Sequence, residues 1–292
     1  MTNPRAADAD SLPPPSALEL QRRTYRRKQT GRSILISLGS TLVFAAVIAW
    51  ILVHSPGWQV TRETFFDGDE FRLAIAPVFQ GLLLNIEVLA FAVVGVAIVA
   101  TLVAAARTLR GAVFFPVRFL AAAYTDLFRG IPFLIVIYLI GFGVPALNFT
   151  DQVISPTLLG TVALVVSYSA YVSEVLRAGI EAVHPSQRLA ARSLGLSHYQ
   201  SLRLIILPQA IRKVTPALMN DFVSMQKDVG LISILGAVDA IRQAQIQNAQ
   251  SFNYTSYVVA ALFFVALSWP FIRLTDWLTA RQRKREQIGG VV

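Results

Sequence analysis

Charged side chains inside long apolar stretches are the residues of this sequence best suited to chemistry. They are Glu87, Glu174, Asp221, Lys227 and Asp228. In a membrane each such ion costs about 3 kcal/mol unless it is paired or hydrated. Each one therefore predicts an ion pair, a contact with a polar solute, or an ion or proton relay.

Two interpretations of Glu87 stay open, because its carboxylate could be neutralised by the ammonium group of a solute or by a Lys or Arg of another helix. Glu174 is different. It lies one helical turn before Arg177, which in turn precedes Glu181 by one turn, so a helix brings the three side chains together. We expect this group to be mainly a structural network.

Other polar groups lie close to these charges and could contact a solute. Tyr168, Ser169, Tyr171 and Ser173 offer hydroxyls within two turns of Glu174. Lys227 could hold a carboxylate substrate, but its neighbour Asp228 favours a local ion pair. The candidate residues of a substrate pathway are Glu87, Tyr168, Tyr171, Glu174, Asn220, Asp221, Ser224 and Lys227.

Several kinds of catalytic or metal chemistry are excluded by what the sequence lacks. It has no cysteine and three scattered histidines, which argues against a metal site. No Gly-Lys dipeptide occurs, so a Walker A loop cannot form. Gly-x-Ser-x-Gly and His-Glu-x-x-His motifs are also missing. We expect no catalytic residues, no metal and no cofactor in this chain.

Composition predicts an all-α integral membrane protein. The 292 residues are 54% hydrophobic and 15% charged, with a mean hydropathy of +0.55. A net charge of +9 would suggest nucleic acid in a soluble protein, but here it indicates basic loops on the cytoplasmic side. Six apolar segments are long enough to span a bilayer: 33–53, 79–105, 130–148, 157–176, 212–238 and 256–278.

Basic residues orient these segments, because Arg and Lys collect in cytoplasmic loops. Both ends of the chain are strongly basic, which an even number of spans explains. The predicted organisation is a basic, largely disordered cytoplasmic tail over 1–32, a first span over 33–53, an extracytoplasmic loop over 54–78, a core over 79–280 with a cytoplasmic loop over 182–208, and a basic cytoplasmic tail over 281–292.

The second cytoplasmic loop contains a helix, a turn and a second helix. Leu189, Ala190, Ala191 and Leu194 can form the apolar face of an amphipathic helix of about three turns. Gly195 can adopt the positive φ of a helix C-terminus, and Pro208 marks the next boundary. Such a helix between two spans predicts a cytoplasmic partner, although a simple surface connection is the alternative.

This loop resembles the signature of the permease subunits of bacterial ATP-binding-cassette (ABC) importers. That signature is Glu-Ala-Ala, three residues, Gly, nine residues, Ile, one residue and Leu-Pro. The matching residues are Ala190, Ala191, Gly195, Ile205, Leu207 and Pro208. Leu189 replaces the usual Glu. The resemblance implies a coupling helix that binds an ATPase through Leu189, Ala190, Ala191, Gly195, Leu207 and Pro208.

Further motifs resemble the polar-amino-acid branch of that family. They are Gly81–Glu87, Asp126–Pro132, Ala170–Ile180 and Leu207–Arg212, with Val229 and Gly230 as departures. In the second motif Gly130 and Pro132 should break a helix, so that Asp126, Arg129, Gly130 and Pro132 form a gate or hinge. The family has five core spans, which makes 33–53 an extra N-terminal one.

The resemblance implies a permease of the bacterial cytoplasmic membrane that imports a polar amino acid or a close derivative. ATP and Mg²⁺ would be bound by a dimer of a separate ATPase. The other partners would be a second permease subunit, the same or similar, an extracytoplasmic amino-acid-binding protein and the lipid bilayer, with no nucleic acid. Two alternatives are a secondary transporter that uses Glu87 or Asp221 as a relay, and a membrane scaffold.

Overall fold

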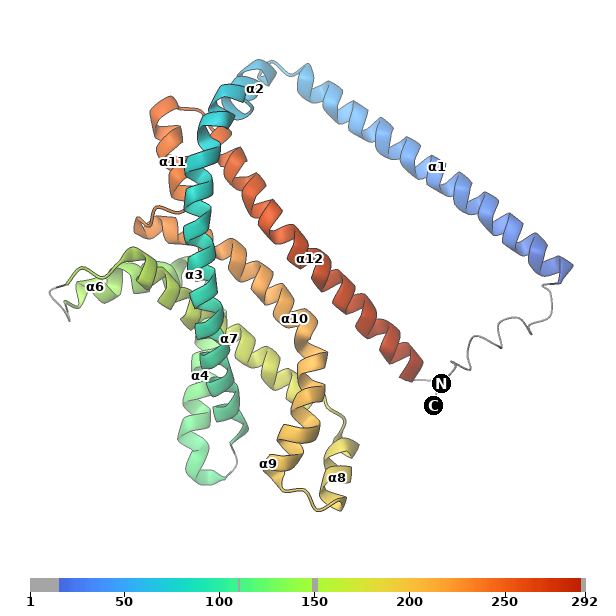
Figure 1. Ribbon diagram of the computed structural model, residues 1–292, viewed down its shortest axis with the longest axis vertical. Coiled ribbons are helices and arrows are strands. Elements are labelled where there is room, and N and C mark those ends of the chain that lie inside the picture. Colours follow the sequence, from blue (N-terminus) through green and yellow to red (C-terminus); the bar gives the residue numbers. More distant parts are fainter. Residues whose placement is uncertain (1–15, 110, 149–151, 290–292) are drawn as a thin grey trace, which may run out of the picture. The chain divides into compact units, whose positions relative to one another are not determined.

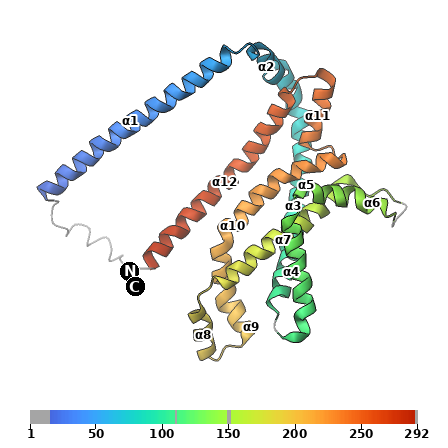
Figure 2. The same cartoon turned by 180° about the vertical axis from the view of Figure 1, so that it is seen from behind.

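The computed structural model describes residues 16–109, 111–148 and 152–289. The chain divides into two compact units, 1–61 and 62–292. Every regular element in the described residues is a helix (Figures 1 and 2). This agrees with the predicted all-α class.

The first unit consists mainly of α1 (Ala17–Val53). Ser16 caps its N-terminus by accepting a hydrogen bond from the Glu19 N–H. The helix begins well before the predicted span, so the expectation of disorder over 1–32 is wrong for residues 17–32. The helix forms over these residues because Ser16 caps it and many of the residues that follow are strong helix formers. Residues 1–15 of that tail lie outside the described part of the chain.

A short helix and a long one follow: α2 (Trp58–Phe65) and α3 (Gly68–Thr108). The predicted loop over 54–78 is therefore largely helical. Asp67 caps α3 by accepting hydrogen bonds from the N–H groups of Asp69 and Glu70. Pro77 lies inside α3, so the boundary predicted between residues 78 and 79 is not the end of a helix.

The core of the second unit forms where α3 packs along α7 (Pro156–Glu181). Val88, Ala92, Ala163 and Leu164 are fully or almost fully buried there. Nearer its N-terminus, α3 packs against α11 (Ala240–Ser251) and α12 (Thr255–Gly289) in a second apolar cluster. Thus α3 joins the two halves of this unit.

The segment predicted as one span over 130–148 is broken. After the short turn η1 (Ala112–Phe114), α4 (Phe115–Gly130) fills most of a predicted cytoplasmic loop. The chain then bends by 106° into α5 (Phe133–Tyr138), the π turn η2 (Leu139–Gly143) and α6 (Val144–Ala146). The predicted break at Gly130 and Pro132 is confirmed. Proline lacks a backbone donor and holds Ile131 in an extended conformation.

The span predicted over 212–238 also differs. The helix α10 (Leu207–Asp228) begins earlier, and the chain tightens into the 3₁₀ segment η4 (Val229–Leu235), which ends at Gly236 with φ +92°. A bend of 51° leads into α11, in a stretch predicted to be a loop. Finally, α12 contains the predicted span over 256–278 and continues as a helix into the predicted tail over 281–292.

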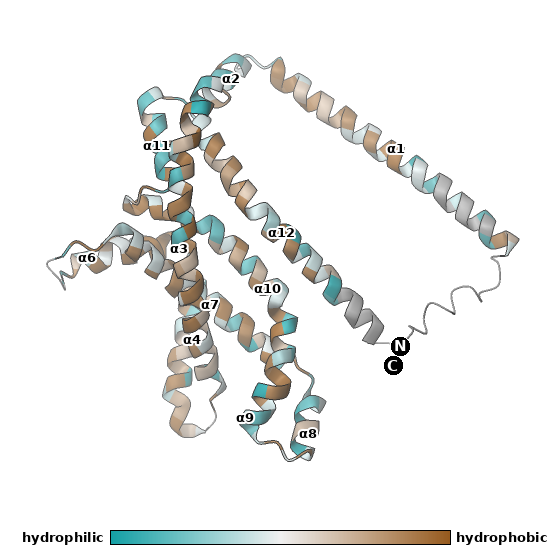
Figure 3. Cartoon of the chain, viewed as in Figure 1, coloured by the Kyte–Doolittle hydropathy of each residue, from teal (hydrophilic) through white to brown (hydrophobic). Residues whose placement is uncertain are grey.

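Four helical segments are long and apolar enough to cross a membrane: Gln29–Val53, Trp58–Thr108, Pro156–Glu181 and Thr255–Gln282. Counting each bent pair as a single span raises the number to six. Apolar residues dominate α3 and α4, whereas polar residues gather on α11 and on the α8–α9 loop (Figure 3). The described chain is therefore an all-helical membrane protein with four to six candidate spans.

Candidate functional site: the α8–α9 loop and the polar groups of the core

The helix α8 (Pro185–Ser193) ends in a specific backbone motif. The N–H of Leu196 donates to the carbonyl of Ala191 at 3.1 Å, and the N–H of Gly195 donates to that of Arg192 at 2.9 Å. These two bonds define a Schellman motif, which requires the residue after the cap to have positive φ. Gly195 has φ +75°, as the sequence predicts.

The next helix, α9 (His198–Ser201), starts with a capping box in which Ser197 and Gln200 exchange backbone and side-chain hydrogen bonds. It continues through the π turn η3 (Leu202–Ile206) into α10. Pro208, predicted to mark a boundary, therefore lies within a continuous helical run. A proline in the first turn of α10 is tolerated because the π turn before it alters the backbone hydrogen bonding.

Apolar side chains of this loop face outward. Leu189 and Leu194 are 63% and 77% exposed, whereas Ala191 is completely buried. Ala190 and Pro208 are exposed, and Leu207 lies at the margin between half-buried and exposed. The loop thus presents a short helix with an apolar outer face on an ordered base, which is suited to contact with another protein.

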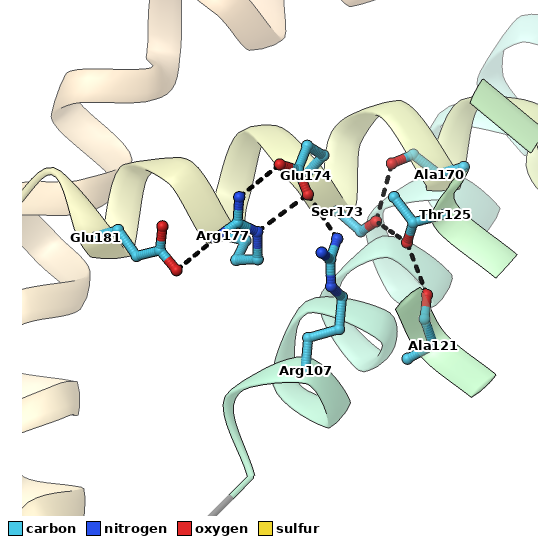
Figure 4. Close-up of polar contacts among 8 residues, drawn as sticks. All are labelled: Arg107, Ala121, Thr125, Ala170, Ser173, Glu174, Arg177 and Glu181. Atoms are coloured by element: carbon cyan, nitrogen blue, oxygen red, sulfur yellow. Dashed lines mark hydrogen bonds and ion pairs between the residues drawn. The ribbon is translucent and has the colours of Figure 1, made fainter. Parts of the chain in front are cut away.

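A network of ion pairs joins α7, near the start of the loop, to the end of α3 (Figure 4). Arg177 donates to both Glu174 oxygens, at 3.0 and 2.6 Å, and also pairs with Glu181. These contacts confirm the predicted pairing along α7. Arg107 at the end of α3 adds a contact of 2.5 Å to Glu174, which the sequence did not indicate because the two residues are distant in the chain. Two guanidinium groups therefore occupy this carboxylate.

Two further hydrogen bonds attach the loop to the end of α7. Arg188 of α8 donates from Nη2 to the carbonyl of Ile180 at 2.8 Å, and Lys213 of α10 donates to the carbonyl of Ala182 at 2.7 Å. α8 is consequently tied to the end of α7, which the Lys213 bond joins to α10 and the Arg107–Glu174 pair joins to α3. A force applied to α8 can therefore reach three long helices through α7.

The predicted pathway residues separate into two groups. Tyr168 is buried in the core and donates from its hydroxyl to Asp228 at 2.8 Å. One carboxylate oxygen of Asp221 is buried and accepts no hydrogen bond from the described residues. In contrast, four of these residues are exposed on the surface of the second unit: Glu87, Asn220, Ser224 and Lys227.

Two predicted contacts are not formed within the described part of the chain. No ion pair joins Lys227 to Asp228 there, because Asp228 turns toward Tyr168 instead. Glu87 likewise has no ion pair with any described residue.

At the predicted hinge, Asp126 and Arg129 are both exposed and do not pair with each other in the described residues. Instead, the carbonyl of Arg129 accepts a hydrogen bond of 3.3 Å from the Tyr171 hydroxyl. This bond fixes the end of α4 against α7, next to the break at Gly130 and Pro132.

A buried pair that sequence reasoning missed joins α3 to α11. Asn85 donates to Asp239 at 2.9 Å and accepts from the N–H of Ala240 at 3.0 Å. Asp239 also caps α11 through the N–H of Arg242. Asp239 stands directly before a helix, which in the sequence indicates an N-cap. Nothing in the sequence indicates its contact with Asn85.

Comparison with known proteins identifies the family. Residues 97–285 match the family described as binding-protein-dependent transport system inner membrane component. The probable glutamine ABC transporter permease protein GlnM of Bacillus subtilis (strain 168) is 32% identical over 218 residues, which cover 74% of this chain and 96% of that protein. The arginine transport system permease protein ArtQ of the same strain is 32% identical over 155 residues, which cover 53% of this chain and 70% of that protein.

Solved structures agree with this result. A crystal structure of an amino acid ABC transporter with histidines has a TM-score of 0.64 at 32% identity, and the match covers 70% of this chain and 94% of that one. A bacterial alginate ABC transporter shares the fold, with a TM-score of 0.56 at 14% identity. The predicted family is confirmed: the chain belongs to the inner membrane components of binding-protein-dependent transport systems, as a non-catalytic permease subunit of an ABC transporter.

Proposed function

We propose that this permease imports a polar amino acid or a close derivative, with α8 as the helix that receives the motion of the ATPase. The named relatives carry glutamine or arginine, and the structural relative is an amino acid transporter solved with histidines. Glutamine, arginine and histidine are therefore the first substrates to test. An ATP-driven importer is favoured over the secondary transporter because the family works with a separate binding protein.

The observation that carries the coupling role is the combination of an exposed apolar face with a rigid base. Leu189 and Leu194 face outward, while the Schellman motif at Gly195 and the bond from Arg188 to Ile180 hold the helix in place. A rigid helix gripped by an ATPase transmits a rigid-body motion when the ATPase closes on nucleotide. The proposed contact residues are Leu189, Ala190, Ala191, Gly195, Leu207 and Pro208.

The proposed partners follow from the same role. A dimer of ABC ATPase subunits binds the α8–α9 loop of this chain and that of a second, identical or similar permease subunit. An extracytoplasmic binding protein delivers the amino acid. A second permease subunit would also cover Glu87, Asn220 and Lys227, which are exposed in the single chain. Together with Tyr168, Tyr171, Glu174, Asp221 and Ser224 they remain the proposed substrate pathway.

The proposed topology has both termini in the cytoplasm and six spans, with α1 as an extra N-terminal span before a five-span core over 79–280. It can be tested by single cysteines, because the natural chain has none. Gln287→Cys should react with a membrane-impermeant maleimide only after the membrane is opened, and Asp69→Cys should react in intact spheroplasts. The reverse pattern would contradict the orientation.

The transport role is tested in liposomes that contain this chain, its ATPase and its binding protein. We expect one or more of glutamine, arginine and histidine to stimulate ATP hydrolysis and to be transported against its concentration gradient. The matched control replaces the ATPase with a variant that binds but does not hydrolyse ATP. Uptake that persists with this variant and follows an ion gradient would contradict the proposal and favour the secondary transporter.

A further inference from the structure

A basic cavity of about 200 Å³ lies beneath the α8–α9 loop, where the ends of α3 and α7 meet. Its polar walls come from four elements. They are formed by Arg107 and Thr108 of α3, Arg177 and Glu181 of α7, Arg188 and Arg192 of α8, and His198 and Ser201 of α9. Its volume is below the range of typical sites for cofactors or drug-sized ligands, so it suits a small ion or a single head group.

The charges around this cavity do not balance. Glu174 and Glu181 are occupied by Arg107 and Arg177, and all three guanidinium nitrogens of Arg177 are used. The guanidinium groups of Arg188 and Arg192 have no carboxylate partner among the described residues. Two positive charges are therefore left over at one small cavity.

Two buried donors at the wall also lack acceptors. The Nε of Arg188 and the hydroxyl of Ser201 are buried without a hydrogen-bond partner in the described residues. The Arg188 side chain is held in place, because its Nη2 donates to the carbonyl of Ile180. Buried donors in proteins are nearly always satisfied. Water could accept from them but would not neutralise the excess charge, whereas an anion does both.

We propose that this cavity binds a phosphoryl-type anion, with Arg188, Arg192 and Ser201 as its main ligands. Guanidinium groups present paired donors that match the oxygens of a phosphate group. The anion would connect α8 and α9 to the ends of α3 and α7, and would thereby stiffen the loop that we propose to bind the ATPase. Its source is either free phosphate or the head group of an anionic phospholipid.

The test uses the full-length chain in nanodiscs of phosphatidylcholine, titrated with inorganic phosphate by calorimetry at constant ionic strength. We expect saturable binding of one anion per chain. Arg188→Gln and Ser201→Ala should each weaken it, the first on the order of tenfold, which is the effect of one charge-assisted hydrogen bond. Arg203→Gln is the matched control, because Arg203 is an exposed arginine of the same loop that does not line the cavity.

A second arm separates the two sources. If nanodiscs that contain phosphatidic acid or phosphatidylglycerol abolish phosphate binding to the wild type, the head group of the lipid is the occupant. If these nanodiscs leave phosphate binding unchanged, free phosphate is the occupant. Size-exclusion profiles and thermal unfolding show whether each variant is folded. If Arg188→Gln does not fold, Ser201→Ala, which is the smaller change, provides the test.

The proposal is overturned if no saturable phosphate binding occurs, or if Arg188→Gln and Ser201→Ala, both folded, bind as tightly as the wild type. It is also overturned if adding the nucleotide-free ATPase abolishes binding, because the cavity would then receive an acidic side chain of that partner. Binding is measured without transport, so its failure would leave the proposed transport role to be judged separately.

Discussion

Gly195 provides a graded test of whether the C-terminal end of α8 must be formed for the ATPase to bind. Its φ of +75° is disfavoured for any residue with a Cβ, and an added Cβ would meet no atom of the described residues within 4 Å. Gly195→Ala therefore adds conformational strain without a clash. The cost is about 1–2 kcal/mol. Asn tolerates this conformation better than Ala, and a β-branched residue tolerates it less.

If binding requires the Schellman motif, this cost appears in the affinity. About 1–2 kcal/mol corresponds to a weakening of roughly 5- to 30-fold. We expect the affinity for the ATPase to fall in the order Gly, Asn, Ala, Val at position 195. The affinity can be measured by surface plasmon resonance with the permease in nanodiscs and the ATPase in solution.

Gly236 supplies the matched control. It also has positive φ, at +92°, and a methyl group added there would meet open space, so the penalty is again purely conformational. It lies at the end of η4, outside the α8–α9 loop. Gly236→Ala should leave ATPase affinity unchanged. Equal losses at 195 and 236, or an affinity at 195 that does not depend on the residue type, would refute the reasoning.

Two further predictions concern stability, measured as thermal unfolding in detergent micelles. Glu174→Gln removes the charge that two guanidinium groups share, and should lower the free energy of unfolding by about 2 kcal/mol. The control Asp276→Asn breaks an exposed ion pair with an N–O distance of 3.6 Å and should lower it by less than about 0.5 kcal/mol. Similar shifts for the two variants would argue against the network. Gly81→Ala would place a Cβ against the backbone at the start of α11 and should lower the free energy of unfolding by about 1–3 kcal/mol. The control Gly39→Ala in α1 meets no described atom and should not destabilise the protein. An unaltered melting curve for Gly81→Ala would contradict the close packing of α3 on α11.

Local signals in the sequence predicted the end of α8, the break after α4 and the ion pairs along α7, but not the continuous helix through Pro208. Gly195 predicted the positive φ because a helix C-terminus needs it, and Gly130 with Pro132 predicted the helix break. The spacing of Glu174, Arg177 and Glu181 predicted their contacts, since a helix fixes which side chains are neighbours. In each case a few adjacent residues contain the whole physical cause.

Features that depend on distant residues were not predictable in the same way. Arg107 joins Glu174, and Asn85 joins Asp239, only because α3 packs against α7 and α11. Hydropathy also misjudged the spans over 130–148 and 212–238. An apolar window does not reveal a π turn or a 3₁₀ segment, and it cannot distinguish a straight span from a bent pair.

The most direct test of the coupling claim is photo-crosslinking from a single position of α8 in the assembled transporter. A photoreactive amino acid is placed at Leu189, which is 63% exposed, and, as the control, at Val153, which is 96% exposed and lies before the N-terminus of α7. Our account predicts that the ATPase is captured from position 189 and not from 153. Capture of the ATPase from neither position, or equally from both, would contradict the assignment of α8 as the coupling helix.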